Sequence, residues 1–171
     1  VIEQRRRHPL VRLSIFRVRS LTSADLILML LGAGMYSMFY FASLYTQDIL
    51  GYDPLKAGLA FLPVSVGMIA GAVGPHQLSG RVGVRALGTA GLMIATAGMI
   101  LLTGITPAGT YLGSLLIGLG PLSIGIGLTF VPITLLATAN VSDEDAGLAS
   151  GLYNTSQQIG GALGLAILST L

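Results

Sequence analysis

Residues 145–171 read DAGLASGLYNTSQQIGGALGLAILSTL, and this stretch decides the fold of the chain. After Asp145 it carries no formal charge as far as residue 171. At a helical rise of about 1.5 Å per residue, such a stretch is long enough to cross a hydrocarbon core of roughly 30 Å. We therefore expect a transmembrane helix over residues 147–171.

The polar residues of this helix lie in register with one another. Tyr153 and Gln157 are four residues apart, and so are Asn154 and Gln158, which places them on one polar stripe at helical spacing. The stripe predicts a helix that presents amide groups to a substrate cavity or to neighbouring helices rather than to lipid.

Small residues recur in the same stretch at the spacing of one helical turn. Gly147 and Gly151 are four residues apart, as are Gly160 and Gly164. Such pairs let two membrane helices approach backbone to backbone. We expect Gly160 and Gly164 to mark a close helix contact.

The composition of the whole chain indicates a membrane protein. Its 171 residues are 53% hydrophobic and only 9% charged, with a mean hydropathy of +0.81, whereas soluble domains carry about 25% charged residues. The lack of cysteine excludes disulfides and thiolate metal sites. The net charge of +2 does not indicate nucleic-acid binding, because six of the nine basic residues lie in the first nineteen positions and form no basic face.

The basic N-terminal segment predicts the orientation in the membrane. Its arginines precede the first apolar stretch, and basic residues beside a span mark the cytoplasmic side. Residues 1–22 fit a cytoplasmic linker, either as a short interfacial helix on anionic lipid or as a solvated chain. The character of the two chain ends leads us to expect a piece of a longer protein.

The first span is expected over residues 23–47. Thr22 or Ser23 would cap this helix, and Asp25 would then lie in its first turn, where the helix dipole favours a carboxylate. Proton carriage is the alternative role for Asp25.

Aromatic side chains mark one face of the same span. Tyr36 and Tyr40 are four residues apart, a spacing that suits either helix packing or the wall of a cavity for flat, hydrophobic ligands. Amide groups on the first and last spans would add hydrogen bonds without a buried charge. The predicted cavity residues are Tyr36, Tyr40, Gln47, Asn154, Gln157 and Gln158.

The second span is expected over residues 57–78, after a tight extracellular turn over residues 48–58. One of its faces carries glycines at helical spacing, which predicts close packing with another helix. These glycines are Gly67, Gly71 and Gly74.

The third and fourth spans share one uncharged run. Residues 86–142 carry no charge, which is too long for one span, and the turn signal at residues 106–110 divides the run. The two spans then cover residues 86–105 and 111–139. Pro121 should kink the fourth span, because proline removes a backbone hydrogen bond.

These spans predict an all-α integral membrane fold with five transmembrane helices, the N-terminus inside the cell and the C-terminus outside. Arg81 and Arg85 lie between the second and third spans, on the same side as the linker arginines. The positions of the basic residues therefore agree with one topology.

The residues do not indicate catalysis. His8 and His76 are the only histidines, and neither a carboxylate pair nor an HExxH motif lies within a span. No metal or cofactor is implied, and neither rings of charge nor a filter sequence indicates a channel. A glycine-rich, proline-containing bundle with sparse polar faces favours a carrier whose helices rock around a central cavity.

Four stretches match a known family: HPLVRLSIFRVRSL (8–21), YTQDILGYDPLKAGLAFLP (45–63), GPHQLSGRVGVRA (74–86) and DAGLASGLYNTSQQIGGALGLA (145–166). The chain resembles the C-terminal half of the fourteen-span drug:proton antiporters of the major facilitator superfamily, the EmrB/QacA type. The third stretch is similar to the cytoplasmic loop motif of that superfamily, with Gly80 where the stronger form has an aspartate. Its motif residues are Gly74, Arg81, Gly83 and Arg85.

The resemblance implies five helices of the six-helix C-terminal bundle, with an N-terminal half outside this chain. It also implies a multi-pass protein of the cell membrane, the inner membrane in bacteria, that exports hydrophobic or cationic drugs and antibiotics in exchange for protons by alternating access. The alternatives are a carrier of the same fold that takes up or exports a metabolite, and a non-transporting membrane sensor or scaffold.

Overall fold

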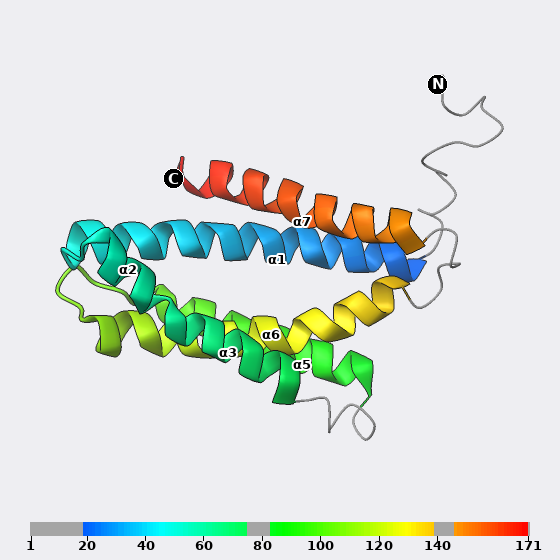
Figure 1. The fold of residues 1–171 in the computed structure, drawn as a ribbon, viewed down its shortest axis with the longest axis horizontal. Coiled ribbons are helices and arrows are strands. Elements are labelled where there is room, and N and C mark those ends of the chain that lie inside the picture. The colour runs from blue at the N-terminus through cyan, green and yellow to red at the C-terminus, as the bar shows by residue number, and fades with distance from the viewer. Residues whose placement is uncertain (1–18, 75–82, 139–145, 171) are drawn as a thin grey trace. The chain divides into compact units, whose positions relative to one another are not determined.

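The computed structural model describes residues 19–74, 83–138 and 146–170 of the chain. These residues form helices without strands, so the predicted all-α fold class is confirmed (Figure 1). The helices are α1 (Arg19–Leu44), α2 (Pro54–Ala60), α3 (Leu62–Val73), α5 (Val84–Leu102), α6 (Leu116–Thr138) and α7 (Ala146–Leu168). The predictions made for the basic linker before Arg19 and for Arg81 lie outside the described residues.

Within the described residues, four segments are long and apolar enough to cross a membrane. They are Leu21–Ile49, Pro54–Val73, Val84–Leu102 and Tyr111–Leu135. The 23-residue helix α7 is long enough to span but is not among the four, since amide and hydroxyl side chains lower its hydropathy. A fifth span at α7 remains a prediction.

Helix α1 begins four residues earlier than the sequence indicated, at Arg19. A cap at Thr22 or Ser23 is therefore wrong, and Asp25 lies in the second turn instead of the first. The physical reason is tertiary: Leu21 is completely buried, and burial of an apolar side chain stabilises a helical turn that propensity alone leaves undecided.

Helix α2 begins at Pro54, inside the segment that the sequence assigned to an extracellular turn. One carboxylate oxygen of Asp53 accepts hydrogen bonds from the backbone N–H groups of Leu55 and Lys56, at 3.0 and 3.1 Å. An aspartate cap followed by proline at the first helical position is a strong start signal, because proline has no N–H to leave unpaired. The turn is therefore shorter than predicted.

A break at Phe61 divides the predicted second span into α2 and α3. Pro63 lies two residues after the break. It has no backbone N–H, so the carbonyl of Leu59, four residues earlier, has no helical partner. The Phe61 N–H turns to the carbonyl of Gly58 instead, at 3.1 Å. The proline thus separates two helices that both belong to one membrane-crossing segment.

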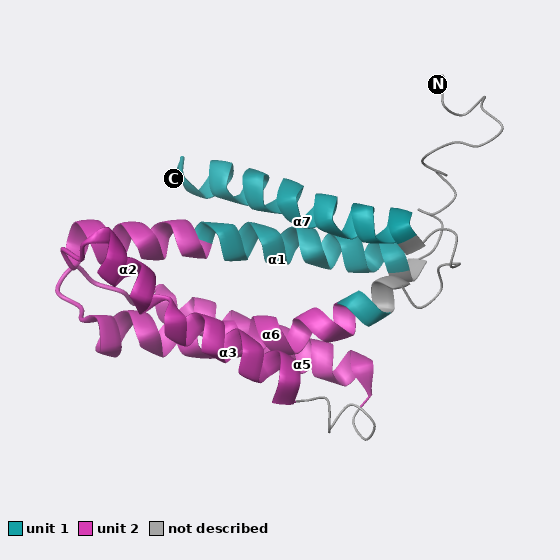
Figure 2. Ribbon diagram, viewed as in Figure 1, with its two compact units in different colours: residues 1–37, 134–171 teal, residues 38–133 magenta. Residues whose placement is uncertain are grey.

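The chain forms two compact units (Figure 2). Unit 1 comprises residues 1–37 and 134–171, and unit 2 comprises residues 38–133. Unit 2 is continuous in sequence, whereas unit 1 combines the two ends of the chain. Helices α1 and α6 contribute residues to both.

In unit 2, α3 and α6 lie against each other with glycine at the contact. A methyl group on Gly67 would overlap the side chain of Ser123, and one on Gly71 would lie 2.9 Å from the backbone nitrogen of Leu128. Residue numbers rise together across this contact, so the two helices run parallel. A methyl group on Gly74 would meet no heavy atom within 4 Å among the described residues. Of the three glycines predicted to pack closely, Gly67 and Gly71 therefore do so.

Helices α5 and α6 approach just as closely but run in opposite directions. A methyl group on Gly91 would lie 2.8 Å from the carbonyl oxygen of Gly125, and one on Gly98 would lie 2.8 Å from the Cα of Leu122. The numbers rise on α5 as they fall on α6, so the pair is antiparallel. α6 also contains Pro121, which the sequence predicts as a kink and the structure places inside a continuous helix.

In unit 1, α1 and α7 run parallel. A methyl group on Gly160 would overlap the carbonyl of Met29, and one on Gly164 would overlap Ala33. Parallel α1 and α7, parallel α3 and α6, and antiparallel α5 and α6 are the directions that alternating membrane spans produce. The order of crossings itself stays a prediction.

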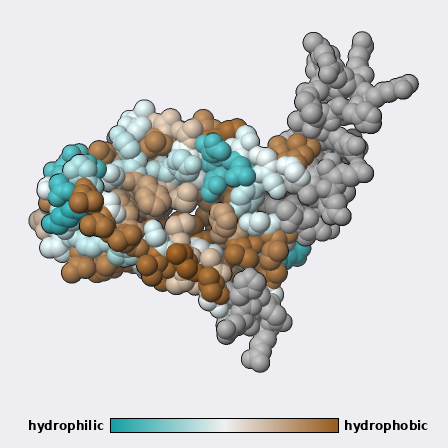
Figure 3. Space-filling model, in the orientation of Figure 1, coloured by the Kyte–Doolittle hydropathy of each residue, from teal (hydrophilic) through white to brown (hydrophobic). Residues whose placement is uncertain are grey.

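The outer side of α3 is apolar. Side chains at helical spacing along α2 and α3 are 55–65% exposed, namely Leu59, Leu62, Val66, Ile69 and Val73. Figure 3 shows hydrophobic residues along this visible side of α3, and hydrophilic residues at the end where α1 turns into α2. An exposed apolar stripe of this length suits contact with lipid.

Candidate functional site

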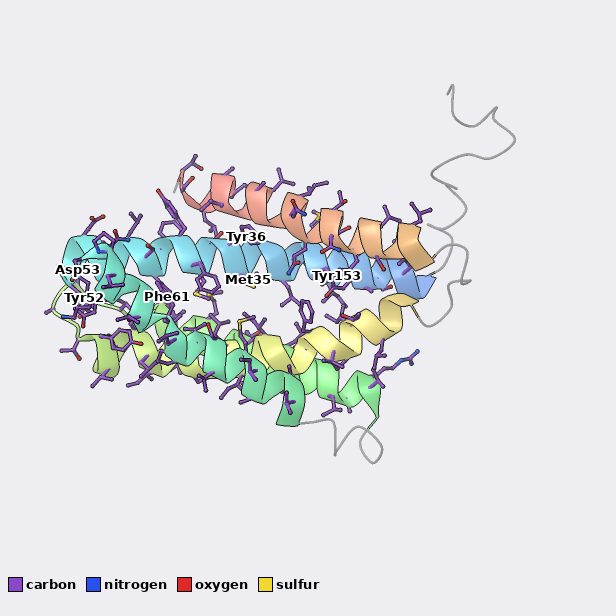
Figure 4. All side chains as sticks on the ribbon, viewed as in Figure 1. Met35, Tyr36, Tyr52, Asp53, Phe61 and Tyr153 are labelled. Atoms are coloured by element: carbon purple, nitrogen blue, oxygen red, sulfur yellow. The ribbon has the colours of Figure 1, made fainter. Side chains whose placement is uncertain are left out.

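The polar stripe of α7 has a buried edge and an exposed edge. On the buried edge, Tyr153 is 9% exposed and its hydroxyl lies 3.2 Å from the hydroxyl of Thr134 on α6, while Gln157 is half-buried. On the other edge, Asn154 and Gln158 are exposed. Figure 4 labels Tyr153 on α7. The buried edge packs within unit 1, and the exposed edge is available to a ligand or to another helix.

The exposed amide of Asn154 bonds locally. Its Nδ2 donates to the carbonyl of Ser150, one turn earlier on the same helix, at 2.9 Å. This bond holds the side chain along α7 and leaves the helix surface around it polar. An amide in this position can exchange a local bond for one to a ligand at little cost, because the carbonyl of Ser150 keeps its helical role.

Tyr36 of α1 lies beside the same part of α7. A methyl group on Gly161 would lie 2.8 Å from the Tyr36 ring, so the ring rests on a glycine surface. The Tyr36 side chain is nevertheless 42% exposed (Figure 4). Gly161 follows Gln157 by one helical turn, so the structure brings this tyrosine close to the amide stripe within unit 1.

Two of the predicted cavity residues belong to unit 2. Tyr40 is 43% exposed, with its ring edge-on to Phe41 at a centroid distance of 5.4 Å. Gln47 is exposed and donates from Nε2 to the hydroxyl of Ser43 at 2.8 Å. Both side chains are accessible on their own unit.

Asp25 is the feature that sequence reasoning placed wrongly. It is only 8% exposed, and neither carboxylate oxygen has a hydrogen-bond partner among the described residues. Its burial follows once the α1–α7 contact is known, because Asp25 precedes Met29 by four residues and Gly32 by seven and so lies on the face of α1 that meets α7.

Two tyrosines tie the outer turns of unit 2 together. The hydroxyl of Tyr111 donates to the carbonyl of Ala60 at the end of α2, and the hydroxyl of Tyr45 donates to the carbonyl of Thr106 at 2.9 Å. Each tyrosine begins a single π-helical turn, Tyr45–Ile49 or Tyr111–Leu115. Sequence reasoning did not find these bonds, since nothing in the local pattern names the distant carbonyl.

The loop motif is described in part. Gly83 has a φ of 82° and caps the N-terminus of α5, a positive-φ conformation that glycine adopts without strain. Arg85 follows in the first turn of α5 and is exposed. Gly74 caps the C-terminus of α3. The motif glycines therefore stand at the two helix ends that the loop connects.

The arrangement suits the binding of a small molecule. Across the part of the chain that the structure describes, no three histidine, cysteine, aspartate or glutamate side chains group as metal ligands. Half-exposed aromatic rings and exposed amides can stack on a flat ligand and form hydrogen bonds with it.

Comparison with known proteins gives a consistent result. Residues 2–165 match the family model described as the Major Facilitator Superfamily. The chain is 36% identical over 174 residues to the puromycin resistance protein pur8 of Streptomyces alboniger, covering 100% of this chain and 35% of that protein. It is 37% identical over 167 residues to the cephamycin export protein CmcT of Amycolatopsis lactamdurans, covering 95% of this chain and 34% of that protein.

A third relative is the multidrug resistance protein Stp of Mycobacterium tuberculosis, 32% identical over 172 residues, with 99% of this chain and 31% of that protein covered. The chain thus spans about a third of the length of the relatives that it matches.

Proposed function

Because this chain belongs to the Major Facilitator Superfamily, we propose that it forms part of a carrier that exports drugs or antibiotics in exchange for protons by alternating access. The chain is a multi-pass membrane protein of a transporter family. The three relatives described above are named for puromycin resistance, cephamycin export and multidrug resistance, and these names support export of such compounds here. All three organisms are bacteria, which supports a place in the bacterial inner membrane.

The observation that carries the proposal is the exposed polar edge of α7. Asn154 and Gln158 lie exposed on α7, and the Asn154 amide has one local bond, to the carbonyl of Ser150. Contact with lipid would leave the other polar atoms of such amides without partners, at a cost on the order of 2–7 kcal/mol per group by hydrocarbon transfer. A cavity that holds water or substrate removes this cost. The Tyr36 ring stands beside the edge and supplies an aromatic surface for stacking.

The proposal has further parts beyond these three residues. Tyr40, Gln47 and Gln157 complete the proposed lining. α7 is the fifth span, the basic N-terminal segment is a cytoplasmic linker, and Pro121 is a hinge point in α6. The helices missing from this chain close the cavity from the other side, and lipid surrounds the whole.

Efflux of a fluorescent hydrophobic cation from cells tests the function of the full-length carrier. We expect cells that express it to lose the dye faster than control cells, and an uncoupler to abolish the difference because it collapses the proton gradient. Dye binding without flux would favour a sensor or scaffold. Indifference to dyes, together with flux of a metabolite, would favour a metabolite carrier.

Variants of α7 test the binding face within the same assay. Asn154→Ala and Gln158→Ala should each raise the apparent KM for efflux several-fold with the maximal rate nearly unchanged, because each removes a hydrogen bond to bound substrate. Ile167→Ala is the matched control, since Ile167 is a 61% exposed apolar residue of the same helix. If the amides only join helices, the two variants will lower the unfolding temperature and leave KM as it was.

A further inference from the structure

One carboxyl group of unit 1 is sealed among apolar side chains. Asp25 is 8% exposed, and its α1 neighbours Leu21, Ala24 and Leu28 are 0–2% exposed. Both carboxylate oxygens lack a hydrogen-bond partner among the described residues. A capping role does not explain this carboxyl group, because α1 begins at Arg19 and places it beyond the first turn.

The α1–α7 contact shows where this carboxyl group lies. Met29 meets Gly160 and Ala33 meets Gly164, so residue numbers rise together on the two helices. One turn before the Met29–Gly160 contact stand Asp25 on α1 and Ser156 on α7. Asp25 therefore belongs to the face of α1 that α7 covers, at the end of the contact nearest the start of both helices.

The helices around Asp25 offer it no counter-ion among the described side chains. On the segments of α1, α6 and α7 that make up unit 1, the other titratable residues in the sequence are Arg19, Tyr36 and Tyr153. The Tyr153 hydroxyl lies 3.2 Å from that of Thr134. Tyr36 rests on Gly161, two turns farther along α7 than Tyr153. Arg19 precedes Asp25 by six residues in the sequence.

A carboxylate in such a place is unstable as an ion. Burial without a counter-ion or donor removes its hydration and returns nothing, so the group either takes a cation or stays neutral. Ionisable residues inside membrane segments that meet this condition commonly mark proton or ion pathways. A proton needs no cavity of its own, so protonation is the simplest way for this buried carboxyl group to become neutral.

We propose that Asp25 is a proton-binding site. Its carboxyl group holds one proton while α1 and α7 enclose it, and it releases that proton to the cytoplasm when water enters between the two helices. No bond other than the O–H bond forms or breaks. This proposal rests on the function proposed above, and it places a proton carrier in this part of the chain, on the first span.

Proton binding is measurable in the purified full-length carrier without transport. Infrared difference spectra between high and low pH should show the C=O band of a protonated carboxylic acid, shifted by ¹³C-aspartate labelling. The Asp25→Asn variant should lose that band. Asp48→Asn, a change at an exposed aspartate of the same membrane-crossing segment, should keep it. Asp25→Glu should show a band that no longer shifts with ¹³C-aspartate.

A second measurement links the site to exchange. In weakly buffered detergent solution, substrate addition should release protons from the unmodified carrier and from Asp48→Asn, and Asp25→Asn should release one proton fewer per carrier. An unchanged infrared band and unchanged proton release in Asp25→Asn would overturn the site. If Asp25→Asn does not fold, the Asp25→Glu spectrum decides, because a band still sensitive to ¹³C-aspartate excludes Asp25. If neither the unmodified carrier nor any variant exports dye, but the infrared band of Asp25 is present, the proposed transport function is wrong and the proton-binding site is still supported.

Discussion

Single glycines on α6 set how closely its neighbours approach. A methyl group on Gly125 would lie 2.6 Å from the carbonyl oxygen of Gly91 and would also overlap the backbone of Ala95. Gly120, on the same helix, has no heavy atom within 4 Å of that position among the described residues. Backbone atoms cannot move aside as a side chain can, so the two positions differ in tolerance although the residue type is the same.

We predict that Gly125→Ala lowers the free energy of unfolding by about 1–3 kcal/mol, the usual cost of overpacking. Gly120→Ala, the matched control, should leave it nearly unchanged or slightly raised. Thermal unfolding in detergent measures both. Equal unfolding temperatures for the two variants would mean that α5 and α6 do not meet at Gly125.

The sequence predicted some of these residue roles and missed others for a definite reason. The spacing of Gly67 and Gly71 and that of Gly160 and Gly164 indicated close packing, because spacing identifies one face of a helix. It does not name the helix that covers that face. Asp25 was misplaced since its role depends on where α1 begins, and burial of Leu21 decides that.

At the scale of elements, α2 shows how one side chain starts a helix. The carboxylate of Asp53 accepts two backbone N–H groups that would otherwise face solvent unpaired, and Pro54 fits the first helical position. The ammonium of Lys56 lies 3.9 Å from the centre of the Tyr52 ring, which holds the following turn against the preceding loop.

Asp53→Ala should therefore destabilise the protein by about 1 kcal/mol, the typical value of an N-cap. Asp53→Asn keeps an oxygen acceptor at the same position and should retain most of the stability. Chemical or thermal unfolding of the two variants separates capping from charge. A loss as large in Asp53→Asn as in Asp53→Ala would show that the negative charge, and not the cap, stabilises this end.

Element boundaries were predictable only where local chemistry decides them. The turn signal at residues 106–110 separates α5 from α6, and the hydroxyl of Thr110 accepts the N–H of Gly113 at the start of the next helical turn. The break at Phe61 was missed because a proline near a helix start is compatible with both one helix and two. Two helices form here, and the Phe61 N–H bonds to the carbonyl of Gly58, three residues earlier.

At the scale of the whole molecule, hydropathy identifies the fold class and the contacts inside each unit supply the directions of the helices. The low charge content already required a membrane as the surrounding solvent. Parallel and antiparallel pairs cannot be read from composition, since they depend on which helices meet. The glycine contacts of α6 and α7 provide that information.

Labelling of single cysteines tests this topology, because the chain contributes no cysteine of its own. In a full-length carrier free of other cysteines, Asp48→Cys and Ala108→Cys should react with a membrane-impermeant maleimide added to intact cells. Ala86→Cys, near the start of α5, should react only after permeabilisation. Reaction of residues 86 and 108 from the same side would contradict the crossing of α5.

The make-up of unit 1 from the two ends of the chain has a consequence for biosynthesis. Helix α1 leaves the ribosome well before its partner α7, and at 5–20 residues per second the delay is on the order of 10 s. Unit 2 is contiguous and can assemble during that interval. Until α7 arrives, Asp25 has no cover from that side, so the nascent chain must keep a carboxyl group hydrated at the membrane surface or shielded by the insertion machinery.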